Sequence, residues 1–162
     1  MDRTVARRAA VAFGSNLGDR HAALAFAARR LALLLTPLIV SDPVETEPVG
    51  DGAAGQPLYL NAVVVGETTL DARALLDALL SIERAWGRER PFPGAPRTLD
   101  LDLILLGDVV SDTTGLRVPH PRFRERFFVL GPLAEVAPDV VDPVSGLKAW
   151  ELLRNLLRDE TR

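Results

Sequence analysis

The sequence predicts an α+β fold, because segments with the two-residue period of strands alternate with segments of helical period along its 162 residues. Their order is strand, helix, strand, strand, helix, strand, followed by two further helical segments. This is the order of a ferredoxin-like βαββαβ unit, in which helices cover one face of an antiparallel sheet. We therefore expect a single domain over 1–162, with a ferredoxin-like antiparallel sheet and additional C-terminal helices.

The first elements are a strand, a helix and an extended segment. Residues 9–13 are apolar and end in a Gly-Ser-Asn turn signal, which predicts the first strand. From Asp19, leucines and alanines recur every three or four residues, which predicts an amphipathic helix that ends before Pro37. Residues 38–46 are expected to be extended, with Pro43 at an edge or a bulge.

The next segments predict two long loops, a strand and a helix. Residues 48–57 contain three glycines and two prolines without any period, and 88–97 is a second loop of this kind. Between them, the β-branched residues of 58–69 predict a strand, and the segment 71–87 predicts a helix with an apolar stripe. Long ordered loops are more often functional than idle, so both loops are candidates for a binding site.

The strand expected over 98–106 alternates most clearly. One face carries Leu99, Leu101, Leu103 and Leu105, and the other carries Thr98, Asp100, Asp102 and Ile104. The two aspartates therefore leave the same face about 6–7 Å apart, and such a pair suits Mg²⁺ bound together with a nucleotide. A solvated strand face would give the same pattern, but the nearby Arg97 favours a site for phosphate and metal. After this strand, helices are expected around 124–134 and over 147–158.

Composition limits the possible functions. The net charge of −3 provides no global field to attract nucleic acid, and the absence of cysteine excludes disulfides and thiolate metal sites. No apolar run is long enough for a membrane span, so we expect a cytoplasmic protein. The basic residues nevertheless form two islands, which predict a local anionic ligand: Arg84, Arg88, Arg90 and Arg97, then Arg117, Arg122, Arg124 and Arg126.

Several other residues have both a functional and a structural interpretation. Arginines in the loop 88–97 could grip the oxygens of a polyphosphate, or they could belong to a solvated loop. Glu83 could pair with one of them or have no role, and His120 could donate to a phosphate or be structural. The rings of Tyr59 and Phe128, with the amide of Asn61, could form a slot that binds a planar heterocycle. Core packing explains the two rings equally well. The segment 14–20 lacks the Gly-Lys-Ser/Thr ending of a phosphate-binding loop.

Five motifs, taken together, resemble those of one known family. They are AFGSNLGDR, YLNAVV, IERAWGRER, APRTLDLDLILLGD and VPHPRFRERFFVLGPLAEVAPD, and they span roughly 11–139 in the family's order. The chain resembles the 6-hydroxymethyl-7,8-dihydropterin pyrophosphokinases of folate synthesis. The resemblance implies transfer of pyrophosphate from ATP to the hydroxymethyl oxygen of the pterin, with release of AMP and with two Mg²⁺ ions.

The resemblance also implies a role for individual residues. The metal ligands would be Asp100 and Asp102, which with Arg88 and Arg97 would form the catalytic set. The ATP site would contain Glu83, Arg88, Arg90, Arg97, Leu103, His120 and Arg126. The pterin site would contain Thr46, Val49, Tyr59, Asn61 and Phe128. The expected partners are these two small molecules, without nucleic acid or membrane, and a monomer is expected.

Two alternatives belong to other functional classes. A ferredoxin-like fold can serve as a catalytically inert module that binds a small molecule, and it can also bind RNA. The combined arginines and aspartates argue against the inert module. The negative charge and the absence of an aromatic RNA-binding strand motif argue against RNA. The chain also departs from better-known members of the family, because 92–97 lacks their tryptophan and Pro121 replaces a tyrosine.

Overall fold

The computed structural model describes residues 5–47, 57–88 and 98–160. The two predicted loops therefore lie almost entirely outside the described residues. The first half contains β1 (Arg7–Ser15), α1 (Arg20–Leu31), β2 (Thr36–Val40), β3 (Val44–Thr46), β4 (Tyr59–Thr68) and α2 (Ala72–Arg88). The second half contains β5 (Asp100–Leu106), β6 (Ser111–Thr113), β7 (Leu116–Val118), the 3-10 helix η1 (Phe123–Glu125), α3 (Phe127–Val136) and α4 (Ala149–Glu160).

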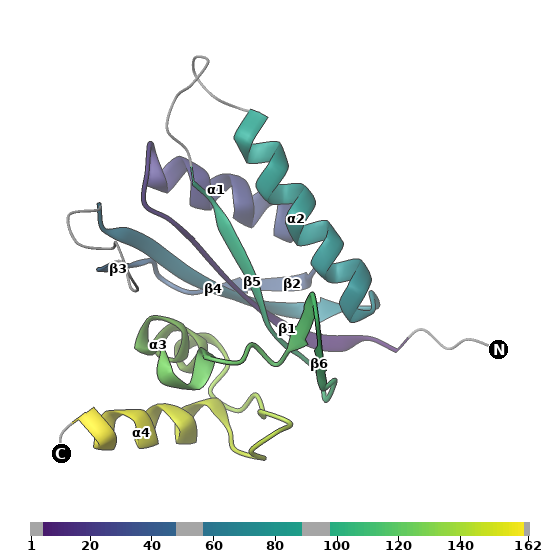
Figure 1. The fold of residues 1–162 in the computed structure, drawn as a ribbon, viewed down its shortest axis with the longest axis vertical. Helices are drawn as coiled ribbons and strands as arrows, with labels where there is room; N and C mark the ends of the chain where they lie inside the picture. Colours follow the sequence, from purple (N-terminus) through teal and green to yellow (C-terminus); the bar gives the residue numbers. More distant parts are fainter. Residues whose placement is uncertain (1–4, 48–56, 89–97, 161–162) are drawn as a thin grey trace.

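The main sheet is antiparallel and has the strand order β2-β4-β1-β5, with β3 also paired to β4. β1 and β4 are the central strands, and β5 lies at one edge. A separate hairpin is formed by β6 and β7. The helices α1 and α2 lie against one face of the sheet, and α3 and α4 lie on the other (Figure 1). The α+β, ferredoxin-like fold with additional C-terminal helices is confirmed.

Each face of the sheet has its own hydrophobic core. The first core joins β1, β4 and β5 to α1 and α2, and its fully buried members include Val11, Leu31 and Leu75. The second core joins the opposite face to α3 and α4 through residues such as Val63 and Leu130. The strands are apolar on both faces because both faces are covered. Within the described ranges, no helix is both long enough and apolar enough to cross a membrane.

The predicted alternation of β5 is correct at its beginning and wrong at its end. Leu101 and Leu103 lie in the first core, as the pattern predicts. Leu105, however, packs in the second core beside Ile104, and Leu106 returns to the first. The pairing with β1 shifts register at this point, so one residue of β5 is extra and the following side chains change faces.

The segment between α1 and β4 also differs from the prediction. The helix begins as predicted, because the Asp19 carboxylate accepts a hydrogen bond from the Ala22 N–H at 3.0 Å. It ends at Leu31, earlier than expected, and the chain then forms two short strands instead of one extended segment. Between these strands, the Ser41 hydroxyl accepts from the Val63 N–H at 2.9 Å and the Ser41 N–H donates to the Val63 carbonyl. Pro43 lies in this break, where it costs no ladder hydrogen bond.

Candidate active site

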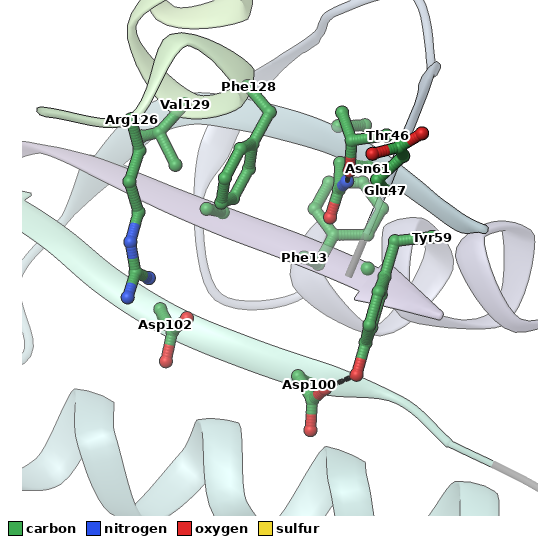
Figure 2. A pocket seen from close by; sticks show the side chains of 13 residues that line it. Phe13, Thr46, Glu47, Tyr59, Asn61, Asp100, Asp102, Arg126, Phe128 and Val129 are labelled. Carbon is green, nitrogen blue, oxygen red and sulfur yellow. Dashed lines mark hydrogen bonds between the residues drawn. The ribbon is translucent and has the colours of Figure 1, made fainter. Parts of the chain in front are cut away.

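The candidate site is a cavity on the face of the sheet that carries α3. We call it the sheet cavity. Residues of β1, β4 and β5 line it, together with the end of β3 and the beginning of α3 (Figure 2). The full lining is Ala12, Phe13, Gly14, Thr46, Glu47, Tyr59, Asn61, Ala62, Asp100, Asp102, Arg126, Phe128 and Val129.

Two carboxylates form one wall of the sheet cavity. Asp100 and Asp102 are exposed residues of β5, and they pair across the sheet with Gly14 and Ala12 of β1. These β1 residues have little or no side chain, and both line the cavity. The pKa of Asp100 is raised, first by burial and then by the negative charge of Asp102, although a hydrogen bond from Tyr59 lowers it. This pair therefore carries negative charge that the protein itself does not fully compensate.

Aromatic and amide groups form another part of the sheet cavity. The Tyr59 hydroxyl reaches Asp100 Oδ2 at 3.5 Å, and its pKa is raised by burial and then by that carboxylate. Figure 2 shows Phe128 extending into the cavity from α3. The Asn61 Nδ2 donates to the Thr46 Oγ1 at 2.7 Å, which fixes the orientation of the amide. This part of the cavity offers two rings and two hydrogen-bonding groups to a flat polar molecule.

Arg126 extends from the start of α3 toward Asp102 (Figure 2). Its guanidinium carbon lies 5.8 Å from the centre of the Phe128 ring, which is a cation–π distance. The arginine therefore lies near both the Phe128 ring and Asp102, where its charge can approach a bound anionic group.

A second cavity lies on the outer side of β5, and we call it the edge cavity. The hairpin of β6 and β7 lines it together with His120, and Asp102 lines both cavities. The full lining is Leu76, Leu101, Asp102, Leu103, Gly115, Leu116, Arg117, His120 and Pro121. The two cavities thus meet at one carboxylate.

His120 is held in one tautomer. Its Nδ1 accepts a hydrogen bond from the Arg122 N–H at 3.1 Å, so the proton of the neutral ring is on Nε2. Burial lowers the pKa of His120, and the charges of Arg126 and Arg122 lower it further, although Asp102 acts in the opposite direction. The ring is therefore a neutral donor through Nε2.

Glu83, on α2, supports the strand that carries the aspartates. Its Oε2 accepts a hydrogen bond from the Leu101 N–H at 2.7 Å, at the residue between Asp100 and Asp102. Burial raises the pKa of Glu83, and both aspartates raise it further, whereas this hydrogen bond lowers it. The described contact of Glu83 is therefore with the backbone of β5.

The Gly-Ser-Asn segment is an anchor in the fold. The Ser15 hydroxyl donates to the Thr98 carbonyl at 2.6 Å, and the Asn16 N–H donates to the Thr98 Oγ1 at 3.0 Å. The Asn16 Nδ2 also reaches the Pro57 carbonyl at 3.5 Å. Ser15 and Asn16 are both buried. Their side chains thus join the end of β1 to the residues that precede β5 and β4.

The structure brings most of the predicted site residues together. Thr46, Tyr59, Asn61, Asp100, Asp102, Arg126 and Phe128 line the sheet cavity. Leu103 and His120 line the edge cavity. Arg88 is the last residue of α2, and its side chain is outside the described part of the chain, as are Val49, Arg90 and Arg97.

Six lining residues of the sheet cavity were not predicted: Ala12, Phe13, Gly14, Glu47, Ala62 and Val129. Gly14 gave a usable signal, because a glycine inside a strand often marks a close approach of another group. The apolar residues gave none, since an apolar residue in a strand or helix is normally explained by the core, and an exposed glutamate such as Glu47 is normally explained as part of the solvated surface. Arg117 in the edge cavity belongs to the second basic island, but the charge pattern did not separate it from its neighbours.

Comparison with known proteins is consistent with this arrangement. The model of the 7,8-dihydro-6-hydroxymethylpterin-pyrophosphokinase family matches residues 10–138. The chain belongs to this family. It is 40% identical over 141 residues to the 2-amino-4-hydroxy-6-hydroxymethyldihydropteridine pyrophosphokinase of Pseudomonas aeruginosa, covering 83% of each protein. It is 44% identical over 152 residues to the protein of the same name from Methylorubrum extorquens, covering 92% of this chain and 93% of that protein.

A solved structure supports the fold of the pyrophosphokinase family for this chain. The wild-type HPPK-DHPS protein of Plasmodium falciparum matches 95% of the chain with a TM-score of 0.70 and 13% identity. The chain spans only 45% of that longer protein. The predicted enzyme class is confirmed by the family: the chain is an ATP-dependent pyrophosphokinase of folate biosynthesis. The inert binding module receives no support.

Proposed function

We propose that pyrophosphate transfer takes place where the two cavities meet, with the pterin in the sheet cavity and ATP in the edge cavity. The observation that carries this proposal is the position of Asp102, which lines both cavities next to Asp100. Substrates bound on its two sides would bring their reacting groups to the same carboxylate pair.

The pterin fits the chemistry of the sheet cavity. A pterin is flat, so the rings of Tyr59 and Phe128 can contact its faces, and its edge carries hydrogen-bond donors and acceptors. Asn61 and Thr46 provide the matching polar groups on the cavity floor. With Val49, these residues form the proposed pterin site. Its hydroxymethyl group would then point toward Asp100.

The residues present fit magnesium bound together with phosphates. No group of three or more possible metal ligands among Asp, Glu, His and Cys occurs in the described residues, but two exposed carboxylates stand side by side on β5. Mg²⁺ commonly takes one or two carboxylates and completes its octahedron with water and phosphate oxygens. We propose that Asp100 and Asp102 hold two Mg²⁺ ions. When bound, the ions would supply charge neutralisation along the polyphosphate.

ATP would be held by donors on several elements. His120 donates from Nε2, and Arg126 extends toward Asp102 from the other side. Leu103 provides apolar surface in the edge cavity, and Glu83 keeps the backbone of β5 in place. Arg88, Arg90 and Arg97 would add bidentate contacts to phosphate oxygens. Arg88 and Arg97 are the two that we assign to the transferring phosphates.

The reaction needs mainly alignment. The hydroxymethyl oxygen forms a bond to the β-phosphorus of ATP, the bond from that phosphorus to the oxygen bridging to the α-phosphate breaks, and AMP leaves with this oxygen. The hydroxyl proton is lost to solvent. Because such transition states are loose, little activation of the nucleophile is required. The residues around Asp102 therefore act by positioning two substrates in line and by balancing the charge that moves between them.

The decisive experiment measures AMP release from MgATP with and without 6-hydroxymethyl-7,8-dihydropterin. We expect AMP and the pterin diphosphate only when pterin, magnesium and intact aspartates are all present. The Asp100→Ala/Asp102→Ala double variant should retain its fold and lose this activity. The matched control is Asp108→Ala, which removes an exposed aspartate just beyond β5 and should leave turnover unchanged.

Two outcomes would contradict the proposal. If the double variant turns over normally, the carboxylate pair does not hold the metals. If the wild-type protein binds both substrates and releases no AMP, the chain does not catalyse the transfer. A single domain, a monomeric state and a cytoplasmic location remain predictions from the sequence.

A further inference from the structure

Gly14 has no backbone reason to be glycine. It lies inside β1, and the described glycines with positive φ are Gly18, Gly107, Gly115 and Gly146. Glycine weakens a strand, because it loses more conformational freedom on folding and offers no side chain for packing. Its presence at this central position therefore calls for a reason in its surroundings.

The space above Gly14 is occupied by the side chain of Asn61. The two residues are direct partners in the antiparallel pairing of β1 and β4. A Cβ atom built on Gly14 would overlap the Asn61 Oδ1, whereas the nearest backbone atom, the Leu60 carbonyl oxygen, would be 3.2 Å away. The obstacle to a larger residue is thus the end of one side chain, and the amide would have to move.

The position of that amide matters because of its second contact. With Oδ1 over Gly14, the Nδ2 group is directed to Thr46 and donates to its hydroxyl at 2.7 Å. Both residues line the sheet cavity. We propose that Gly14 is a positioning residue for pterin binding, because the absence of its side chain lets the Asn61 amide lie over β1 and keep its bond to Thr46. This inference rests on the proposed pterin site.

Gly14 also connects the two halves of the sheet cavity. Across the sheet it pairs with Asn61 on one side and with Asp100 on the other, so the three residues form one row. In this row the Asn61 amide covers Gly14, and the Asp100 carboxylate stands on its other side. A substrate whose ring is held at the amide would therefore lie one residue across the sheet from Asp100.

The first test is the Gly14→Ala variant. The added methyl group should displace the Asn61 amide and weaken its contacts, so the KM for the pterin should rise about tenfold, the effect of losing one good hydrogen bond. The KM for ATP should change less than roughly twofold, because ATP binds elsewhere in the proposal. Equal changes in both KM values, or no change in either, would overturn the inference.

Gly66→Ala is the matched control, since it makes the same substitution in the same sheet. A Cβ at Gly66 would lie 2.8 Å from the Leu35 Cβ and 3.0 Å from the Pro37 carbonyl oxygen, away from both cavities. This variant should lower stability while both KM values stay within roughly twofold of the wild type. A rise in the pterin KM of this control would show that the assay reports general destabilisation, and the proposed role of Gly14 would fall.

A double-mutant cycle separates the inference from the proposed function. Asn61→Ala alone should raise the pterin KM, and adding Gly14→Ala should then have no further effect, because the clashing amide is gone. If Asn61→Ala leaves the pterin KM unchanged, the proposed pterin site is wrong. If Asn61→Ala raises it and the effect of Gly14→Ala is undiminished in the double variant, only the role of Gly14 is wrong.

Discussion

Asp142 and Asp100 show two opposite uses of a carboxylate in this chain. Asp142 is only 1% exposed, and it accepts hydrogen bonds from Arg124, Ser145 and a backbone N–H. Burial acts to raise its pKa, but these bonds outweigh burial and the pKa is lowered. Asp100 is more exposed, yet its pKa is raised by burial and by the neighbouring Asp102.

The difference shows where the protein provides partners for charge and where it does not. Near η1 and α4, the Arg124 guanidinium holds Asp142 through two nitrogens, with Nη2 2.8 Å from Oδ1, so the ion pair serves the fold. On β5, two like charges stand together, which costs stability unless a cation joins them. Loss of Asp142 should therefore lower stability with little effect on activity, whereas loss of a carboxylate on β5 should lower activity with little effect on stability.

The largest effect is expected for Asp102→Ala. The variant loses the carboxylate shared by both cavities, so kcat should fall on the order of 100- to 1000-fold. The free energy of unfolding should stay within about 0.5 kcal/mol of the wild type or rise slightly, because repulsion with Asp100 is removed. AMP release and urea unfolding measure the two quantities. Turnover within roughly threefold of the wild type, which is comparable to the scatter of such assays, would contradict the assigned role.

The reverse pattern is expected for Asp142→Ala. Removing one partner of a buried ion pair should lower the free energy of unfolding by about 2–4 kcal/mol. The kcat of the folded fraction should stay within roughly twofold, because neither residue of the pair lines the proposed site. Ser145→Ala is the control, and it should cost only about 1 kcal/mol, the value of one hydrogen bond. Loss of activity without loss of stability would refute this division.

The pH dependence of stability tests the charge of Asp142 directly. Because its pKa is lower in the folded chain than in the unfolded chain, the ionised form stabilises the fold above the ordinary carboxyl pKa. This stabilisation is lost as the pH falls through the folded pKa. Asp142→Asn should therefore be less stable than the wild type at about pH 7, and the gap should narrow below about pH 4. Urea unfolding across this range measures the gap, and a constant gap would exclude an electrostatic origin.

The smallest effect is expected for Tyr59→Phe. The hydroxyl reaches Asp100 at 3.5 Å, which is too long for a strong hydrogen bond, and the ring is retained. The kcat and the pterin KM should change less than about threefold. Tyr59→Ala, which removes the ring, should raise the pterin KM by roughly tenfold. Similar KM values for these two variants would show that the ring does not contact the pterin.

The order of the elements could be predicted from the sequence because it depends on local periods. The amphipathic helices, β4 and the beginning of β5 have clear periods, and Asp71 caps α2 by accepting from the Ala74 N–H at 2.8 Å. The face of Leu105 could not be predicted, since the shift of register depends on how β5 pairs with β1. The early end of α1 was missed for a related reason: Leu35 is fully buried beyond Leu31, so the apolar stripe continues past the end of the helix.

The candidate site could be proposed from the sequence where polar residues interrupt the expected apolar pattern. Asp100 and Asp102 were recognisable as carboxylates on one strand face, and the family motifs pointed to the aromatic and amide residues. Phe13 was missed because its cavity partners are distant in sequence, so only the folded sheet brings them together. The contact of Glu83 was also hidden, because its partner is a backbone N–H of β5.

β5 is an edge strand, and an open edge can pair with a strand of another chain and start aggregation. Here the Leu101 N–H is bonded to Glu83, and the Ile104 carbonyl accepts from the His120 N–H at 2.9 Å. These two contacts occupy a backbone N–H and a backbone carbonyl at the outer edge of β5, and an incoming strand would need such groups for pairing. Glu83 and His120, which lie beside the acidic pair, thus also help to prevent strand pairing between molecules at high concentration.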